Sequence, residues 1–72
     1  MRSQNGAERK EFKKFLHKKN VSYRECAEMI NISLDALHNK VNGYTEFRPK
    51  EIKALADIFK FSPEEIYKFF IA

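Results

Sequence analysis

The stretch of residues 22–43 constrains the fold of this chain more than any other, because it contains helix-start and helix-stop signals at close spacing. Ser22 and Glu25 have the spacing of a capping box, in which the Ser hydroxyl accepts a hydrogen bond from the third helical N–H and the Glu carboxylate accepts one from the N–H of the cap. The apolar residues that follow repeat with helical spacing: Cys26, Met29 and Ile30. We therefore expect a short helix that begins after Ser22 and buries this stripe.

A second short helix is expected after a tight turn. Asn31 is one of the few residues other than Gly that accept the left-handed backbone of a sharp helix stop. Ser33 can cap a helix that runs through Leu37 to about Val41, and the Asn-Gly pair at residues 42–43 ends it. Two short helices joined in this way form a helix-turn-helix, whose second helix suits the major groove of DNA.

Three further segments show apolar residues at helical spacing. The first covers residues 7–19, another begins at Pro49, and the last runs from Pro63 to about Phe70, both prolines being suited to the first turn of a helix. No segment predicts a strand. We expect the packed core to include the following residues: Phe12, Leu16, Cys26, Ile30, Leu37, Ile52, Leu55, Phe59 and Ile66.

The chain is therefore expected to form one all-α domain of five short helices. With 72 residues it can bury one small core, in residues 7–72, behind a polar, flexible leader of residues 1–6. No apolar run approaches the ~20 residues of a membrane span and no export signal is visible, so we expect a cytoplasmic protein. Three consecutive apolar residues, 69–71, cannot all be buried easily. At least one should be exposed or serve an interface, for which a homodimer through the C-terminal helix is the first candidate.

Positive charge is concentrated at the start of the chain. The formal net charge is +4, with seven basic and two acidic side chains in residues 1–19 but seven basic and eight acidic in residues 20–72. Such a basic helix suits either a solvated face or contact with nucleic-acid phosphates. The candidates for phosphate contact are Lys10, Lys13 and Lys14.

The composition argues against catalysis and against a metal or cofactor. Cys26 lies on an apolar helical face without a second cysteine nearby, which is typical of a buried, inert thiol. His17 and His38 lie on different predicted helices and have no cluster of ligands with metal-binding spacing. No nucleophile elbow and no Gly-rich phosphate loop is present, so we expect no enzyme activity.

An ordered set of residues resembles a known family. Its members here are Ser22, Ala27, Asn31, Ile32, Ser33, Leu37, Asn42, Gly43 and Phe47, followed by the runs EIKALADIFKF and SPEEIYKFF. This set is similar to the phage Cro/repressor-type helix-turn-helix family, in particular to small Cro-like or repressor-modulator proteins of Gram-positive phages. The resemblance covers roughly residues 8–70. It implies a lambda-repressor-like DNA-binding domain whose partner is double-stranded operator DNA.

The resemblance also implies which residues touch DNA. In the family, outward residues near the start of the second motif helix, and one turn later, contact base edges. Here Asn39 can read adenine, Asp35 can accept from the cytosine amino group, and Leu34 can touch a thymine methyl group. Tyr23 stands where the family usually has a Gln that grips phosphate. The complete set of candidate DNA- or partner-binding residues is Tyr23, Arg24, Leu34, Asp35, His38, Asn39, Lys40 and Tyr44.

Two functions remain open at this point. The first is a Cro-like transcription regulator that binds operator DNA in a switch between lytic and lysogenic growth. The second is an anti-repressor or modulator of the same fold, which docks Leu34, Asp35 and Tyr44 on the basic DNA-reading surface of a cognate phage repressor. The motif is poor in positive charge, and this feature motivates the second function.

Overall fold

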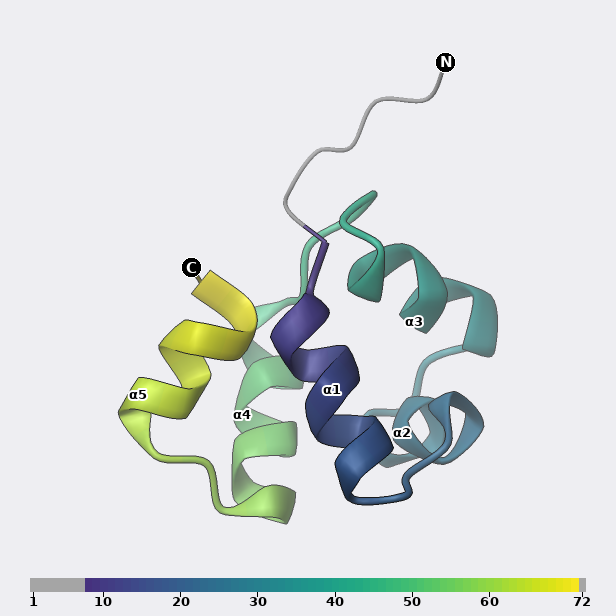
Figure 1. The fold of residues 1–72 in the computed structure, drawn as a ribbon. Helices are drawn as coiled ribbons and strands as arrows, with labels where there is room; N and C mark the ends of the chain where they lie inside the picture. The colour runs from purple at the N-terminus through teal and green to yellow at the C-terminus, as the bar shows by residue number, and fades with distance from the viewer. Residues whose placement is uncertain (1–7, 72) are drawn as a thin grey trace.

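The computed structural model describes residues 8–71, which form five α-helices and a terminal π-helical turn (Figure 1). In chain order these are α1 (Lys10–Lys18), α2 (Tyr23–Met29), α3 (Leu34–Val41), α4 (Pro49–Phe59), α5 (Pro63–Ile66) and the π turn η1 (Tyr67–Ile71). The described residues include no strand, which confirms the predicted all-α fold. Among these residues, no helix has the length and apolar character needed to cross a bilayer. The predicted leader, residues 1–6, lies outside the described residues.

The first helix starts later than predicted. Its predicted start, Ala7, lies outside the described residues, and α1 begins only at Lys10 because Arg9 has a non-helical backbone with φ −89° and ψ 66°. The Arg9 N–H donates to the carbonyl of Val41 at 2.8 Å, so the chain before α1 is bonded to the end of α3. At the other end, Asn20 stops the helix as predicted, with a left-handed φ of 59°.

Helix α1 runs between two groups of helices (Figure 1). On one side of it lies the C-terminal helix, formed by α5 and η1, and on the other side lie α2 and α3. The closely packed pairs include α1 with η1, α1 with α3, and α2 with α3. This arrangement places the two predicted motif helices side by side at one end of the molecule.

Phenylalanine rings form the centre of the core. All seven Phe side chains have another Phe ring within contact distance, and Phe12 of α1 is 0% exposed. The ring of Phe12 lies 5.1 Å from Phe70 and 5.8 Å from Phe47, measured between centroids. Such tilted and edge-to-face pairs stabilise a core beyond the burial of their area. One ring thus connects α1, the loop after α3 and the C-terminal helix.

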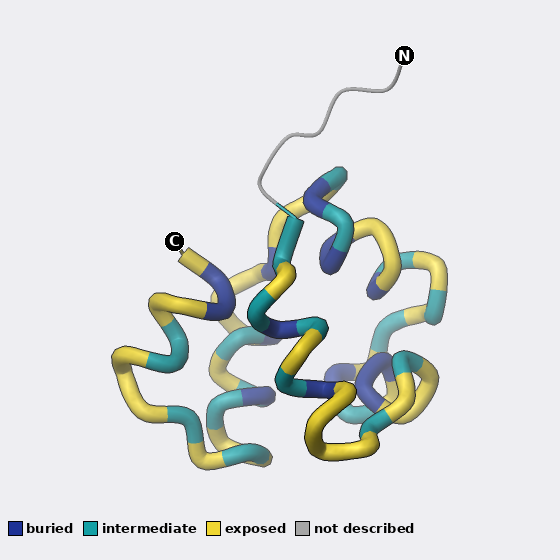
Figure 2. Tube along the Cα trace, in the orientation of Figure 1, coloured by how far each residue is buried: buried dark blue, intermediate teal, exposed yellow. Residues whose placement is uncertain are grey.

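The predicted core is largely confirmed. Buried as predicted are Phe12, Leu16, Cys26, Ile30, Leu37 and Leu55. The other three predicted members are half-buried and pack against that core: Ile52, Phe59 and Ile66. The prediction omitted Val41, Phe47, Phe69 and Phe70, all of which are buried. Figure 2 shows buried positions interspersed with exposed ones along α1, α2, α3 and α4, as amphipathic helices require.

The end of the chain differs from prediction in its winding. The helix expected to reach Phe70 as a regular α-helix changes to a π turn at Tyr67. Within this turn Phe69 and Phe70 are both buried, whereas Ile71 is 61% exposed. The expectation that at least one of these three residues is exposed is therefore confirmed.

Candidate nucleic-acid interface

Helix α2 starts with the predicted capping box. The Ser22 hydroxyl accepts from the Glu25 N–H at 3.1 Å, and the Glu25 carboxylate accepts from the Ser22 N–H at 3.0 Å. The hydrogen bond that the Glu25 carboxylate accepts from the Ser22 N–H, with a smaller contribution from the Ser22 side chain, lowers the pKa of Glu25 below its ordinary value. Asn31 ends the helix with φ 58°, and the Ile32 N–H donates to the Ala27 carbonyl at 3.0 Å. Local chemistry therefore defines the turn between α2 and α3.

Helix α3 presents a polar outer face. Ser33 caps its start by accepting from the Ala36 N–H at 3.1 Å, and Leu37 and Val41 anchor it as fully buried residues. Three side chains on the opposite arc are exposed: Asp35, His38 and Asn39. Gly43 then ends α3 with φ 86°, a backbone that Gly adopts without steric cost.

The start of α2 lies against this outer face. The ring of Tyr23 meets the ring of His38 edge-on, with 4.9 Å between centroids and 80° between planes. Tyr23 is half-buried, while Arg24 beside it is exposed. We use the name reading face for the surface formed by the following residues: Tyr23, Arg24, Leu34, Asp35, His38 and Asn39.

Another predicted binding residue, Tyr44, lies in the loop that follows α3. Tyr44 is half-buried in the loop, and its N–H donates to the Asn39 carbonyl at 2.9 Å, so this loop residue lies next to the reading face. Leu34 is likewise half-buried. The helix-turn-helix thus brings together seven of the eight predicted residues, and Lys40 is the exception.

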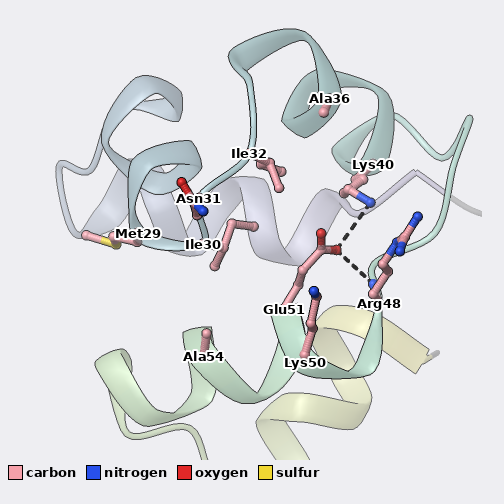
Figure 3. A pocket seen from close by; sticks show the side chains of 10 residues that line it. All are labelled: Met29, Ile30, Asn31, Ile32, Ala36, Lys40, Arg48, Lys50, Glu51 and Ala54. Atoms are coloured by element: carbon pink, nitrogen blue, oxygen red, sulfur yellow. Dashed lines mark hydrogen bonds and ion pairs between the residues drawn. The ribbon is translucent and has the colours of Figure 1, made fainter.

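The placement of Lys40 differs from the prediction. Its side chain is buried, with Nζ 3.2 Å from the Glu51 carboxylate (Figure 3). Nζ also lies 3.2 Å from the Glu46 carbonyl. The reason is helical geometry, because Lys40 follows Leu37 by three positions and therefore points to the inner side of α3. Glu51 is buried as well and accepts from the Arg48 N–H at 2.8 Å. Lys40 is therefore removed from the candidate contact residues.

A groove of about 580 Å³ lies between α3 and the first turns of α4 (Figure 3). Its apolar lining comes mainly from the α2–α3 turn, and its far wall carries the exposed residues Arg48 and Lys50. A helix N-terminus with two adjacent cations attracts anions such as phosphate. The sequence reading missed these two residues, although both flank the Pro49 that marks the start of α4.

The predicted phosphate-contacting lysines of α1 do not lie on the reading face. Lys10 and Lys14 line shallow pockets together with Lys68 of the C-terminal helix, which lies across α1 from α2 and α3 (Figure 1). Lys14 lies 3.6 Å from the carboxylate of Glu11, and Lys13 pairs with Glu8, lowering the pKa of that carboxyl. The Lys14–Glu11 pair is largely exposed and the Lys13–Glu8 pair is half-buried. Ion pairs that water reaches are weak, so these lysines remain able to contact phosphate.

The surface of the motif carries little positive charge. Within residues 22–43, all of which the structure describes, Arg24 is the only exposed Lys or Arg, because Lys40 is buried. Three exposed acids accompany it: Glu25, Glu28 and Asp35. Attraction to DNA phosphates therefore has to come from residues beside the motif, such as Arg48 and Lys50.

The cysteine of α2, Cys26, has a free thiol that is buried in the core. Cys26 is 0% exposed, and desolvation raises the pKa of its thiol to about 11, which keeps it protonated at neutral pH. Among residues 8–71, no group of three or more His, Cys, Asp or Glu side chains could hold a metal ion. The described surface offers groups for recognition by hydrogen bonds and charge.

Comparison with known proteins agrees with this geometry. The profile of the Cro/C1-type helix-turn-helix DNA-binding domain matches residues 11–70, which span α1 to the buried end of the C-terminal helix. No curated protein and no solved structure gives a significant match. Since the profile covers most of the 72 residues, the chain belongs to the Cro/C1-type helix-turn-helix DNA-binding domain family.

Proposed function

We propose that this protein is a Cro-like transcription regulator that binds operator DNA in a phage-type switch between lytic and lysogenic growth. The observation that carries the proposal is the outer face of α3, on which Asp35, His38 and Asn39 are all exposed while Leu37 and Val41 anchor the helix. A helix supported in this way can enter the major groove without loss of its packing. The family to which the chain belongs is named for DNA binding.

The exposed side chains suggest distinct roles. Asn39 suits adenine, whose N6 and N7 match a side-chain amide, and Asp35 suits the amino group of cytosine. Arg24 at the start of α2 can contact one backbone, and Arg48 with Lys50 at the start of α4 can contact phosphates on the other side of α3. In this proposal phosphate contacts position the protein, and residues of α3 read the sequence.

The proposal includes a homodimer formed through the C-terminal helix. Two large apolar side chains on this helix are exposed, Tyr67 at 57% and Ile71 at 61%. Pairing these surfaces around a twofold axis removes them from water and presents two α3 helices to DNA half-sites about one helical turn apart.

A second function is favoured by the charge of the motif, residues 22–43. Because Lys40 is buried, the motif exposes one Arg against three acids, which suits a basic protein surface better than a phosphate-lined groove. In this alternative the protein is an anti-repressor that docks Leu34, Asp35 and Tyr44 on the DNA-reading surface of a cognate phage repressor. In that complex the Asp35 carboxylate takes the place of a DNA phosphate.

One experiment separates the two functions. The wild-type protein is tested for mobility shift of duplexes selected from a random-sequence pool and of the switch region, with and without the cognate repressor. A DNA regulator shifts a preferred duplex by itself at nanomolar concentration and moderate salt. An anti-repressor leaves DNA unshifted and removes the repressor from it, which would contradict the first proposal.

Asp35→Ala sharpens this test, with Asp57→Ala as a control that removes the same charge from the exposed side of α4. For a base reader, Asp35→Ala relaxes the preference at one base pair by about 1–3 kcal/mol. For an anti-repressor, it weakens the protein complex by about 2–5 kcal/mol if the carboxylate is buried against a partner cation. Asp57→Ala should change neither quantity. Equal changes in binding for Asp35→Ala and Asp57→Ala would show that binding depends on the net charge of the protein and not on the position of Asp35.

A further inference from the structure

The packing around α3 is uneven. Helix α3 packs closely on α2 and on α1, whereas no pair that includes α4 is among the most closely packed helix pairs of residues 8–71. Between α3 and α4 lies the groove of about 580 Å³ described above. Leu37 and Val41 of α3 belong to the same buried core as Leu55 of α4, but where the groove lies the facing surfaces of the two helices are not in apolar contact, so polar interactions there also contribute to the angle between α3 and α4.

A buried ion pair bridges this gap (Figure 3). Lys40 of α3 and Glu51 of α4 are 8% and 6% exposed, and their charged groups are 3.2 Å apart. Lys40 also donates to the carbonyl of Glu46, and Glu51 accepts from the N–H of Arg48. Directional bonds therefore connect α3 with the loop of residues 42–48 and with the first turn of α4.

We propose that the Lys40–Glu51 ion pair is a positioning device that determines how sharply the protein discriminates between DNA sequences and adds little to its stability. The inference rests on the proposed DNA-reading function. Neutral groups of similar shape can often replace a buried ion pair without loss of stability, because desolvation offsets the attraction. Base readout, by contrast, requires α3 to be held in register with the groups that contact phosphate. Both residues act through α3 and α4 and, being buried, do not touch DNA.

The double variant Lys40→Met/Glu51→Gln removes the ion pair together with the hydrogen bond from Lys40 to the Glu46 carbonyl. Met keeps the unbranched stem of Lys, and Gln can still accept from the Arg48 N–H in a capping box. The variant removes one charge of each sign, so the net charge and the general attraction to phosphate do not change. The matched control is Lys53→Met/Asp57→Asn, which removes another Lys–carboxylate pair, 3.3 Å apart, from the exposed surface of α4.

The first readout is DNA binding. The probes are the duplex that the wild-type protein selects from a random-sequence pool and a shuffled duplex of the same composition. In the Lys40→Met/Glu51→Gln variant, affinity for the selected duplex should fall about tenfold or more, as for the loss of one base contact. Affinity for the shuffled duplex should stay within about twofold, and the melting temperature should change by less than about 5 °C. The control variant Lys53→Met/Asp57→Asn should match the wild type in its affinity for each of the two duplexes and in its melting temperature.

Other results overturn the inference. Unchanged affinity for the selected duplex means that the pair does not position α3. An equal fall on both duplexes, or a large fall in melting temperature, means that the pair is simply a stabilising element. Each of these outcomes leaves the proposed DNA-binding function intact, because the wild-type protein still selects its duplex.

The second readout needs no DNA. Amide hydrogen exchange of Tyr44, whose N–H donates from the loop to the Asn39 carbonyl of α3, should become about tenfold faster in the double variant, while exchange of Leu16 in α1 stays the same. Unchanged exchange in the loop overturns the positioning role in any case. If the wild-type protein selects no duplex, the proposed function fails and the discrimination role fails with it, while faster exchange still shows that the pair holds the loop.

Discussion

Replacing Leu55 by Ala tests the structural basis of the whole domain. Leu55 is 0% exposed and is the central residue of the inner face of α4. Truncating a fully buried Leu costs about 2–5 kcal/mol, from lost burial and from the cavity that remains. A domain of 72 residues has a free energy of unfolding of about 4–11 kcal/mol. The variant should therefore lose about half of its stability, measured by urea unfolding followed by far-ultraviolet circular dichroism.

Ile58→Ala is the matched control on the same helix. Ile58 has the same number of carbon atoms as Leu55 but is 46% exposed. Its truncation removes less burial, and the better helix propensity of Ala offsets part of the loss, so the cost should stay below about 1 kcal/mol. Equal losses for the two variants would refute the assignment of the buried face of α4. A smaller slope of the unfolding free energy with urea would instead indicate a change in the unfolded state.

Three further predictions concern the caps, the pH dependence and the basic helix. Ser22→Ala removes the acceptor of the Glu25 N–H and should cost about 1 kcal/mol in urea unfolding. The pKa of Glu25 is lower in the folded protein than in the unfolded chain, so the ionised carboxylate stabilises the fold at pH values above the unfolded pKa. This stabilisation is lost as the pH falls through the folded pKa. The Glu25→Gln variant should therefore lose less stability on acidification than the wild-type protein, as measured by urea unfolding at several pH values. Replacing Lys10, Lys13 and Lys14 by Ala should weaken binding to all DNA sequences alike and flatten its salt dependence by about one unit per lost contact, and an unchanged slope would show that α1 is a solvated face.

The distribution of charge decides how such a domain can approach DNA. The reading face itself is poor in cations, whereas Arg48 and Lys50 stand at the start of α4, across the groove from α3. Affinity and sequence readout are therefore assigned to different elements in the proposed complex. In this proposal the relative position of α3 and α4 determines whether base contacts and phosphate contacts can form at the same time. The buried Lys40–Glu51 pair between the two helices is therefore the pair to mutate.

Several features of the fold were predictable because their physical causes are local. A capping box needs only Ser22 and Glu25, three residues apart, and a left-handed helix stop needs only the tolerance of Asn31 for positive φ. The apolar stripe of a helix likewise needs only residues within two or three turns. These signals predicted the helices of the motif, whereas the outward positions Asp35 and Asn39, which are exposed, were implied by the family resemblance.

The sequence by itself therefore determined the helix-turn-helix and the outer face of α3, whereas only the tertiary structure decided what surrounds them. The sequence predicted Lys40 to be a surface cation, but in the tertiary structure it is buried beside Glu51 of α4. Lys14 of α1 likewise lies near Lys68 of the C-terminal helix, which is remote in sequence. Phe47 became a core residue because Phe12 and Phe70 meet it from distant parts of the chain. The physical reason is that burial and ion pairing depend on contacts between segments remote in sequence, while caps and helical periodicity depend on the nearest residues alone.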